Sequence, residues 1–151
     1  MRVLVKVSGD LVGTYVFNTW LKELAEDPSI DAPVDLWVLS GAGTNISQAL
    51  DEAKEPYTFG PGGREGLTSN GIRIAYHQLL LAQVKISAGH TIVPVWSQWS
   101  FMLNGDLLAQ ALYPNFDKVY IVATPGREKS FVARYDRMEI VYLGGPTDGR
   151  R

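Results

Sequence analysis

The chain has 151 residues and a mass of 16.7 kDa, the size of one domain. Hydrophobic residues make up 46% and charged residues 20%, which excludes a disordered or fibrous protein. Fourteen basic against sixteen acidic residues give a net charge of -2, which argues against a nucleic acid as the main partner. The absence of Cys excludes disulfides and thiolate chemistry, and two histidines are too few for most histidine zinc sites.

We expect neither a membrane-spanning helix nor an export signal from the pattern of apolar residues. No apolar run approaches the roughly 18–20 residues that a membrane helix needs. The apolar stretch at the N-terminus is too short for the core of a signal peptide. We therefore expect a cytoplasmic protein without a membrane partner.

The first third of the chain alternates between strand and helix patterns. Residues 2–8 form a β-branched run that reads as a buried strand. In residues 15–26 apolar side chains recur at intervals of three and four residues, which predicts a helix with one apolar face. A second strand is expected at 35–39, followed by a glycine turn and a helix capped by Thr44 or Asn45.

The rest of the chain continues the alternation. The Gly- and Pro-rich residues 55–65 predict a loop, and the spacing of apolar residues predicts a long helix over 70–88. Pro94 in the strand predicted at 91–96 favours an edge strand or a strand end. A helix opening at 104–106 and strands at 118–124 and 139–143 complete the series. The order predicts one α/β domain over residues 1–151, a three-layer α/β/α sandwich with a mainly parallel sheet.

Ligands of open α/β sheets bind at the carboxyl ends of the strands. Three predicted strands end there in small-residue turns, at residues 8–10, 40–45 and 124–126. In the second turn Gly41 and Gly43 allow close backbone approach, and the following helix directs N–H groups at an anion such as phosphate. An ordinary strand-to-helix turn explains the same residues, and neither a Walker A loop nor a full dinucleotide fingerprint is present.

Lys6 lies inside the first apolar strand, two residues before Ser8 and Gly9. A lysine there either leans to the surface of an edge strand or directs its charge into a cleft at the sheet end. If the second alternative holds, Lys6 and the Gly41–Asn45 turn converge on one anion.

Five segments along the chain carry recognisable motifs: Val5–Asp10, Leu39–Ile46, Asn70–Ile72, Asn104–Ala109 and Asp117–Thr124. The order of these segments resembles that of the motifs of the amino acid kinase superfamily, especially its uridylate kinase branch. They correspond to the family's Lys-x-Ser-Gly turn, its Gly-Gly-Gly-Asn-Ile loop, two helix starts and a strand ending in Thr. They span most of the chain, so the resemblance implies an amino acid kinase-like fold, shortened at the C-terminus.

The resemblance also implies roles for individual residues. Lys6 would hold the transferred phosphoryl group, Asp106 would bound its pocket, and Thr124 would begin the nucleotide site. The substrate- and phosphate-binding residues would be Ser8, Gly9, Gly41, Gly43, Thr44 and Asn45. ATP and Mg²⁺ would be the cofactors, since phosphoryl transfer needs positioning and charge stabilisation above all.

Departures from the family pattern keep a second function open. Pro125-Gly126 stands where the family has an Asp-Gly pair, Thr68 replaces an Asp, and the family's region with a second Lys has no counterpart before Leu143. One hypothesis is therefore a kinase that transfers phosphate from ATP to a small anionic or phosphorylated acceptor. The alternative is a catalytically inactive relative that forms a homo-oligomer through the apolar helix 71–88. An unrelated nucleotide or sugar-phosphate binder is a weaker third hypothesis.

Two further features allow more than one interpretation. Arg64 and Arg73 could bind an anionic substrate or be solvated surface charges. The aromatic cluster in residues 96–102 could stack on a ring of a ligand or form an oligomer contact.

Overall fold

The computed structural model describes residues 1–27, 34–41, 43–60, 63–83, 85–86, 91–93, 97–98, 101–102 and 105–144. Predictions that concern Ala42, residues 94–96, Trp99 and Asn104 lie outside these residues, as do the side chains of Phe101 and Met102.

The core of the molecule is a five-stranded parallel sheet of order β5-β2-β1-β8-β9. Its strands are β1 (Arg2–Val7), β2 (Asp35–Ser40), β5 (Thr91–Val93), β8 (Lys118–Ala123) and β9 (Met138–Tyr142). The predicted α/β class with a mainly parallel sheet is confirmed. The short strand β5 lies at an edge, as the proline after it suggested.

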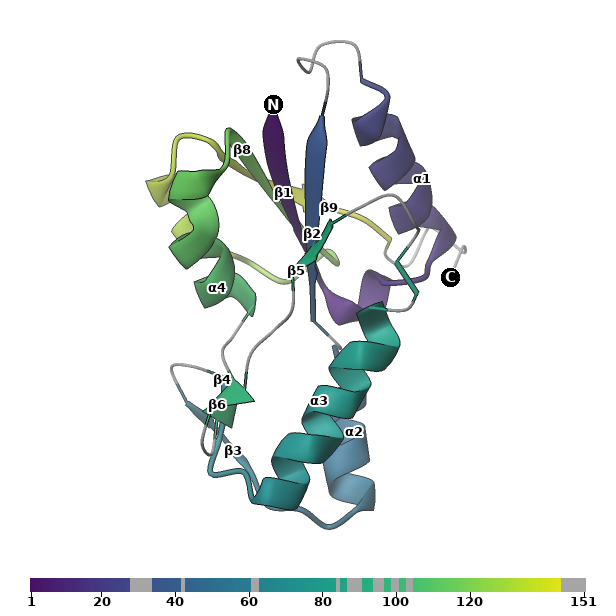
Figure 1. Ribbon diagram of the computed structural model, residues 1–151, viewed down its shortest axis with the longest axis vertical. Coiled ribbons are helices and arrows are strands. Elements are labelled where there is room, and N and C mark those ends of the chain that lie inside the picture. Colours follow the sequence, from purple (N-terminus) through teal and green to yellow (C-terminus); the bar gives the residue numbers. More distant parts are fainter. Residues whose placement is uncertain are drawn as a thin grey trace.

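The helices α1 (Tyr15–Ala25) and α4 (Gly105–Leu112) lie on opposite sides of the sheet (Figure 1). On the α1 side the ring of Trp20 meets that of Tyr120 edge-on, with centroids 5.5 Å apart. On the other side Phe116, just after α4, meets Trp37 at 5.9 Å. Both faces of β1 are therefore buried, and Val3, Leu4, Val5 and Val7 are fully inaccessible to solvent.

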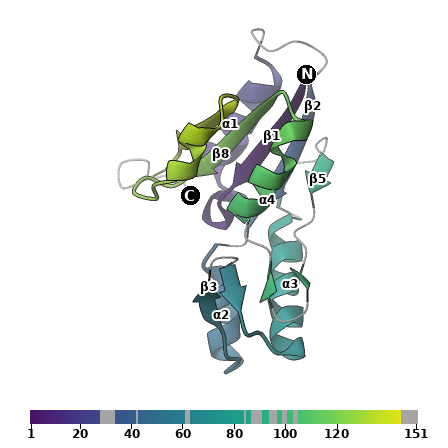
Figure 2. The same ribbon diagram turned by 90° about the vertical axis from the view of Figure 1, so that its left-hand side faces the viewer.

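The helices α2 (Asn45–Glu52) and α3 (Ser69–Gln83) pack together beyond the carboxyl end of the sheet (Figures 1 and 2). Two small hairpins lie at the same end: β3 (Thr58–Gly60) with β4 (Gly63–Glu65), and β6 (Ser97–Gln98) with β7 (Phe101–Met102). Strands β4 and β7 are in contact. This end of the molecule therefore surrounds the positions at which ligands of parallel sheets bind.

The structure corrects the prediction of a plain loop at residues 55–65, because the hairpin β3–β4 occupies most of this segment. Phe59 pairs with Arg64 across the strands, and the guanidinium lies 5.2 Å from the ring centroid. Three residues per strand are too few to give an alternating pattern, so only the Gly/Pro turn was visible in the sequence.

In the described residues, three short 3₁₀ helices connect these elements: η1 (Gly9–Leu11), η2 (Tyr113–Asn115) and η3 (Ser130–Arg134). The helix predicted over 70–88 ends earlier, since α3 stops at Gln83. No helix in the described part of the chain is both long and apolar enough to cross a membrane.

Candidate functional site

Lys6 lies near the carboxyl end of β1, the central strand of the sheet. Its relative exposure is only 9%, so a lysine leaning to the surface of an edge strand is excluded. Side chains alternate along a strand, so Lys6 lies on the same side of the sheet as Leu4. This side carries α4, because Asp106 of that helix contacts Lys6. The interior of the sheet end therefore contains a buried ammonium group.

The carboxylate of Asp106 joins two lysines. Its Oδ1 lies 3.1 Å from Nζ of Lys6, and its Oδ2 accepts a hydrogen bond of 2.7 Å from Nζ of Lys129. Asp106 is in the first turn of α4, and Lys129 comes from the loop between β8 and η3. The three side chains are 11–20% exposed. Two cations share one carboxylate, which leaves the cluster with a net positive charge.

The surroundings change the acidity of both partners. Burial lowers the pKa of Lys6 below its usual 10.5, and the nearby charges of Lys129 and Arg127 act in the same direction, against the effect of Asp106. Burial alone would raise the pKa of Asp106, but the charge of Lys6 and the hydrogen bond from Lys129 hold it below its usual 3.8. The carboxylate therefore stays ionised and fixes both ammonium groups.

Glycines follow β1 and β2 at the same end of the sheet as this cluster, and another glycine begins α4. A Cβ at Gly41 would lie 3.8 Å from the backbone nitrogen of Gly9 and 4.0 Å from that of Gly43. We call this space beside Gly41 the glycine cradle, and a methyl group there would make ordinary van der Waals contacts with both neighbours. At Gly105 a Cβ would come within 2.9 Å of Cε of Lys6, so a glycine at the start of α4 leaves room for the lysine.

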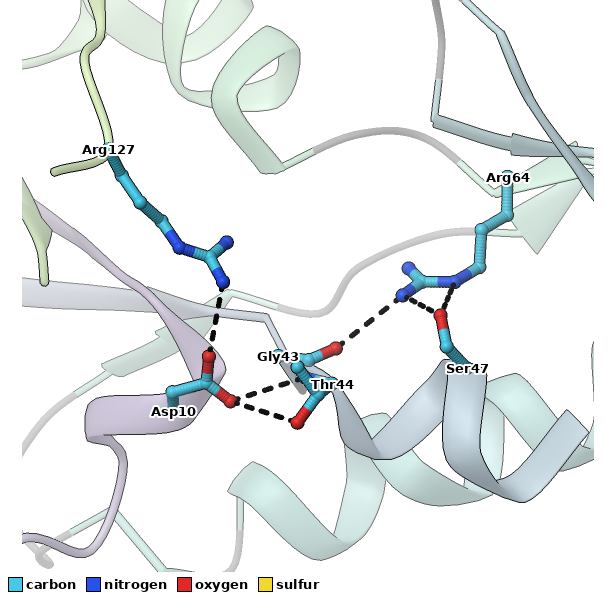
Figure 3. Close-up of polar contacts among 6 residues, drawn as sticks. All are labelled: Asp10, Gly43, Thr44, Ser47, Arg64 and Arg127. Atoms are coloured by element: carbon cyan, nitrogen blue, oxygen red, sulfur yellow. Dashed lines mark hydrogen bonds and ion pairs between the residues drawn. The ribbon is translucent and has the colours of Figure 1, made fainter. Parts of the chain in front are cut away.

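Asp10 binds the turn before α2 (Figure 3). Its Oδ1 accepts hydrogen bonds from the backbone N–H of Thr44 at 3.2 Å and from the Thr44 hydroxyl at 3.4 Å. Its Oδ2 lies 3.5 Å from Nη2 of Arg127. One N–H group that we expected to face a ligand is therefore bound by an internal carboxylate. Gly43, with φ of 61°, lies directly against Asp10.

Arg64 approaches the same turn from the hairpin β3–β4 (Figure 3). Its Nη2 donates a hydrogen bond of 2.8 Å to the Ser47 hydroxyl and one of 3.5 Å to the carbonyl of Gly43. Within the described residues no carboxylate lies within ion-pair distance of Arg64, and burial lowers its pKa. Arg64 is therefore a half-buried cation with neutral partners, whereas Arg73 is exposed on α3.

The other predicted residues lie around the cluster. Ser8 is buried and its N–H donates to the carbonyl of Val122, which joins the ends of β1 and β8. Thr124 follows β8, and its carbonyl accepts a hydrogen bond from the N–H of Arg127. Asn45 lines an open pocket of about 260 Å³ together with Gly9 and, among others, Lys85 near the end of α3.

Sequence reasoning missed Lys129 and Arg127, and it gave no role to the side chain of Asp10. The available signal was weak: Arg127 and Lys129, separated by Glu128, follow the Thr124-Pro125-Gly126 turn at the end of a predicted strand. That position alone predicts proximity to the other strand ends, but not pairing with two particular carboxylates.

The described residues contain no group of three or more His, Asp or Glu side chains that could hold a metal ion. Asp10 and Asp106, the carboxylates of this region, both face cations. Both carboxylates are engaged by cations, so the basic groups of this region fit an anion better than the carboxylates fit a directly bound Mg²⁺ ion.

Comparison of the chain with protein-family models, curated proteins and solved structures finds no significant match.

Proposed function

We propose that the chain binds the phosphate groups of a small molecule or nucleotide at the carboxyl ends of β1, β2 and β8. The observation that carries this proposal is the buried Lys6–Asp106–Lys129 cluster at the sheet end to which Gly9 and Gly41 also belong. Lysine ammonium groups and backbone N–H groups are the donors that proteins use for phosphate. The positive cluster would be neutralised by such a ligand.

We further propose that this site belongs to a three-layer α/β/α fold of the amino acid kinase type. Lys6 is on the first strand and Asp106 on a later helix start, in the order that the resemblance implies. Lys129 supplies a second lysine, and it lies earlier in the chain than the second lysine of the family. The β8–η3 loop thus compensates for one of the departures noted in the sequence.

In this proposal the protein transfers phosphate from ATP to a small anionic acceptor. Lys6 and Lys129 would stabilise negative charge on the transferred group, and Asp106 would orient both ammonium groups without touching it. The backbone of Gly9 and Gly41 would allow close approach of the phosphate, whereas Gly43 lies against the carboxylate of Asp10. The residues that are present do not form a protein site for Mg²⁺, and no step assigned to them uses the metal.

Calorimetric titration with ATP, with and without Mg²⁺, tests the proposal. Wild-type protein is expected to bind, and Lys6→Met is expected to lose about tenfold to a hundredfold in affinity, because a charge-assisted contact is removed. Asp106 keeps Lys129 as a partner in this variant, so the fold is retained. Lys118→Met is the matched control, since Lys118 pairs with Glu139 at the other end of the sheet. Equal affinity of all three proteins would refute the assignment of Lys6.

A second candidate function, that of an inactive subunit with a role in assembly, is favoured by one observation. Tyr76, Leu80 and Leu81 are 38–44% exposed on α3, although Ala75, Leu79 and Ala82 of the same helix are buried. Apolar surface of this kind suits a second copy of the chain.

Light scattering across micromolar concentrations tests the assembly. An oligomer is expected for wild-type protein and a monomer for Leu80→Gln. Leu107→Gln is the control, because Leu107 is 40% exposed on a different helix. A wild-type monomer throughout would contradict assembly through α3.

A further inference from the structure

An open pocket lies between η1 and the last turns of α3, and we call it the η1–α3 pocket. Residues of η1, α2 and α3 and their flanks line it: Gly9, Val12, Asn45, Gln78, Leu81, Ala82 and Lys85. Figure 1 shows the last turns of α3 beside the segment that links β1 to α1. Of the described groups proposed to bind phosphate, only Gly9 also lines this pocket. The pocket therefore forms a second site, with a lysine of its own.

Lys85 brings a positive charge to the pocket. Gly13 has a φ of 82°, and a Cβ at this position would lie 3.3–3.7 Å from Cβ, Cγ and Cδ of Lys85. The stem of the lysine therefore lies along the backbone of Gly13, which holds it next to η1. In the described part of the chain, no carboxylate lies within ion-pair distance of its ammonium group. An anionic ligand would gain a charge-assisted contact there without breaking an existing ion pair.

The remaining side chains of the pocket are apolar or carry amides. Val12 and Ala82 are buried, whereas Leu81 is 43% exposed. Because Leu81 lines the pocket, a bound aliphatic chain would cover part of this apolar surface. Asn45 and Gln78 add amide groups that can donate and accept hydrogen bonds. Among the described lining residues there is no Asp or Glu, so an ammonium group of a ligand would meet no counter-charge.

The size of the pocket limits the size of its ligand. Its volume of about 260 Å³ lies just below the range of roughly 300–1,000 Å³ that is typical of pockets for drug-sized molecules. We therefore expect a ligand smaller than a nucleoside, with a chain of about four to six carbons and one charged end. One ammonium group balances the single charge of a carboxylate, but not the charge of up to about two that a phosphate monoester carries.

We propose that the η1–α3 pocket binds a short aliphatic carboxylate that has no amino group. The carboxylate contacts the ammonium group of Lys85, and the chain lies against Leu81 and Ala82. The amides of Asn45 and Gln78 hydrogen-bond to polar atoms of the ligand or to water beside it. This binding does not depend on the proposed phosphate function, because Lys6, Asp106 and Lys129 take no part in it.

An NMR titration of the isotope-labelled full chain with pentanoate tests the site. Wild-type protein is expected to bind in roughly the millimolar range, with shifts of the side-chain amide signals of Asn45 and Gln78. Lys85→Met keeps the stem beside Gly13 and is expected to bind about tenfold more weakly. Lys22→Met removes an exposed charge from the last turn of α1 and is expected to bind like the wild type.

Two comparisons test the class of ligand. Norvaline is pentanoate with an α-amino group, and it is expected to bind at least about tenfold more weakly, because its ammonium group has no partner in the pocket. Leu81→Gln is expected to lose about fivefold in affinity for pentanoate, because it removes apolar contact. Leu80→Gln is the matched control, since Leu80 is 44% exposed and does not line the pocket.

Three results would overturn the proposal. The first is the absence of amide shifts at a pentanoate concentration of about 0.1 M. The second is equal affinity for pentanoate and norvaline, and the third is a loss in Lys85→Met no larger than that in Lys22→Met. Pentanoate binding by a protein that binds neither ATP nor phosphate would refute the proposed function and leave this site standing. ATP binding without pentanoate binding would overturn this proposal alone.

Discussion

Replacement of Asp106 by asparagine removes the carboxylate that the two lysines share and changes little in shape. Lys6 is buried and lies 3.1 Å from Oδ1 of Asp106, so the variant leaves a buried ammonium group without its counter-charge. Lys129 loses its acceptor carboxylate at the same time and continues to repel Lys6. We expect Asp106→Asn to destabilise the fold.

The size of the loss follows from the geometry. At an effective dielectric constant of roughly 20, two unit charges 3.1 Å apart attract by about 5 kcal/mol. Two effects reduce this figure: the asparagine amide oxygen can still accept one hydrogen bond, and burial of the carboxylate no longer opposes folding. We therefore expect a loss of about 2–4 kcal/mol, near the lower end of the range for broken buried ion pairs. Domains of this kind have about 5–15 kcal/mol of stability, so the variant is expected to fold.

Urea unfolding followed by tryptophan fluorescence measures the difference in free energy of unfolding. Glu139→Gln is the matched control, because it removes the carboxylate of the Lys118–Glu139 pair, in which Glu139 is 55% exposed. The control is expected to change stability by less than about 0.5 kcal/mol. If Asp106→Asn loses no more than this control, Lys6 does not depend on Asp106 and the electrostatic account of the site is wrong.

Three further predictions concern pH and the glycines. The pKa of Asp106 lies below its unfolded value of 3.8, so the carboxylate makes its full contribution to stability above pH 3.8. As the pH falls further, the stability difference between wild type and Asp106→Asn should shrink. Unfolding measured over a series of acidic pH values tests this. Gly43→Ala combines a positive φ with a clash against Asp10 and should lose about 2–4 kcal/mol in urea unfolding, whereas Gly66→Ala, with φ of 71° and open space, should lose about 1 kcal/mol. Equal losses would show that Asp10 is not packed against Gly43. Gly105→Ala should change stability by less than about 1 kcal/mol, since Cε of Lys6 can move away from the added methyl group. The shifted lysine should bind phosphate more weakly in a titration. Unchanged binding would contradict the position of Lys6.

The central part of the fold was predictable because its pattern is local. The β-branched run of β1 predicts a strand, and the spacing of apolar residues by three and four positions in α1 predicts a helix. The alternation of strands and helices along the chain predicts a parallel sheet. Lys6 was recognisable because a charge inside an apolar run is unusual. Its two possible environments could be separated only when the strand order placed β1 in the centre of the sheet.

The charge network was not predictable from the sequence. Lys129 reaches Asp106 across 23 residues, and Asp10 reaches Thr44 across 34. Such contacts depend on the path of loops, for which the sequence has no periodic signal. Arg64 illustrates the same limit: beside a Gly/Pro turn it resembles a solvated charge, yet the hairpin carries it to Ser47 and Gly43.

The most direct test of the phosphate site is the shift of the melting temperature on addition of phosphate, for wild-type protein and Gly41→Ala. The added methyl meets Gly9 and Gly43 only at ordinary van der Waals distances, so the variant is expected to fold with a similar melting temperature. It would nevertheless fill the glycine cradle. At a phosphate concentration of 100 Kd the wild type should gain about 2.7 kcal/mol, and Gly41→Ala should gain little or nothing. An equal gain in both proteins would place the bound anion elsewhere, and no gain in either would contradict a phosphate site at the end of this sheet.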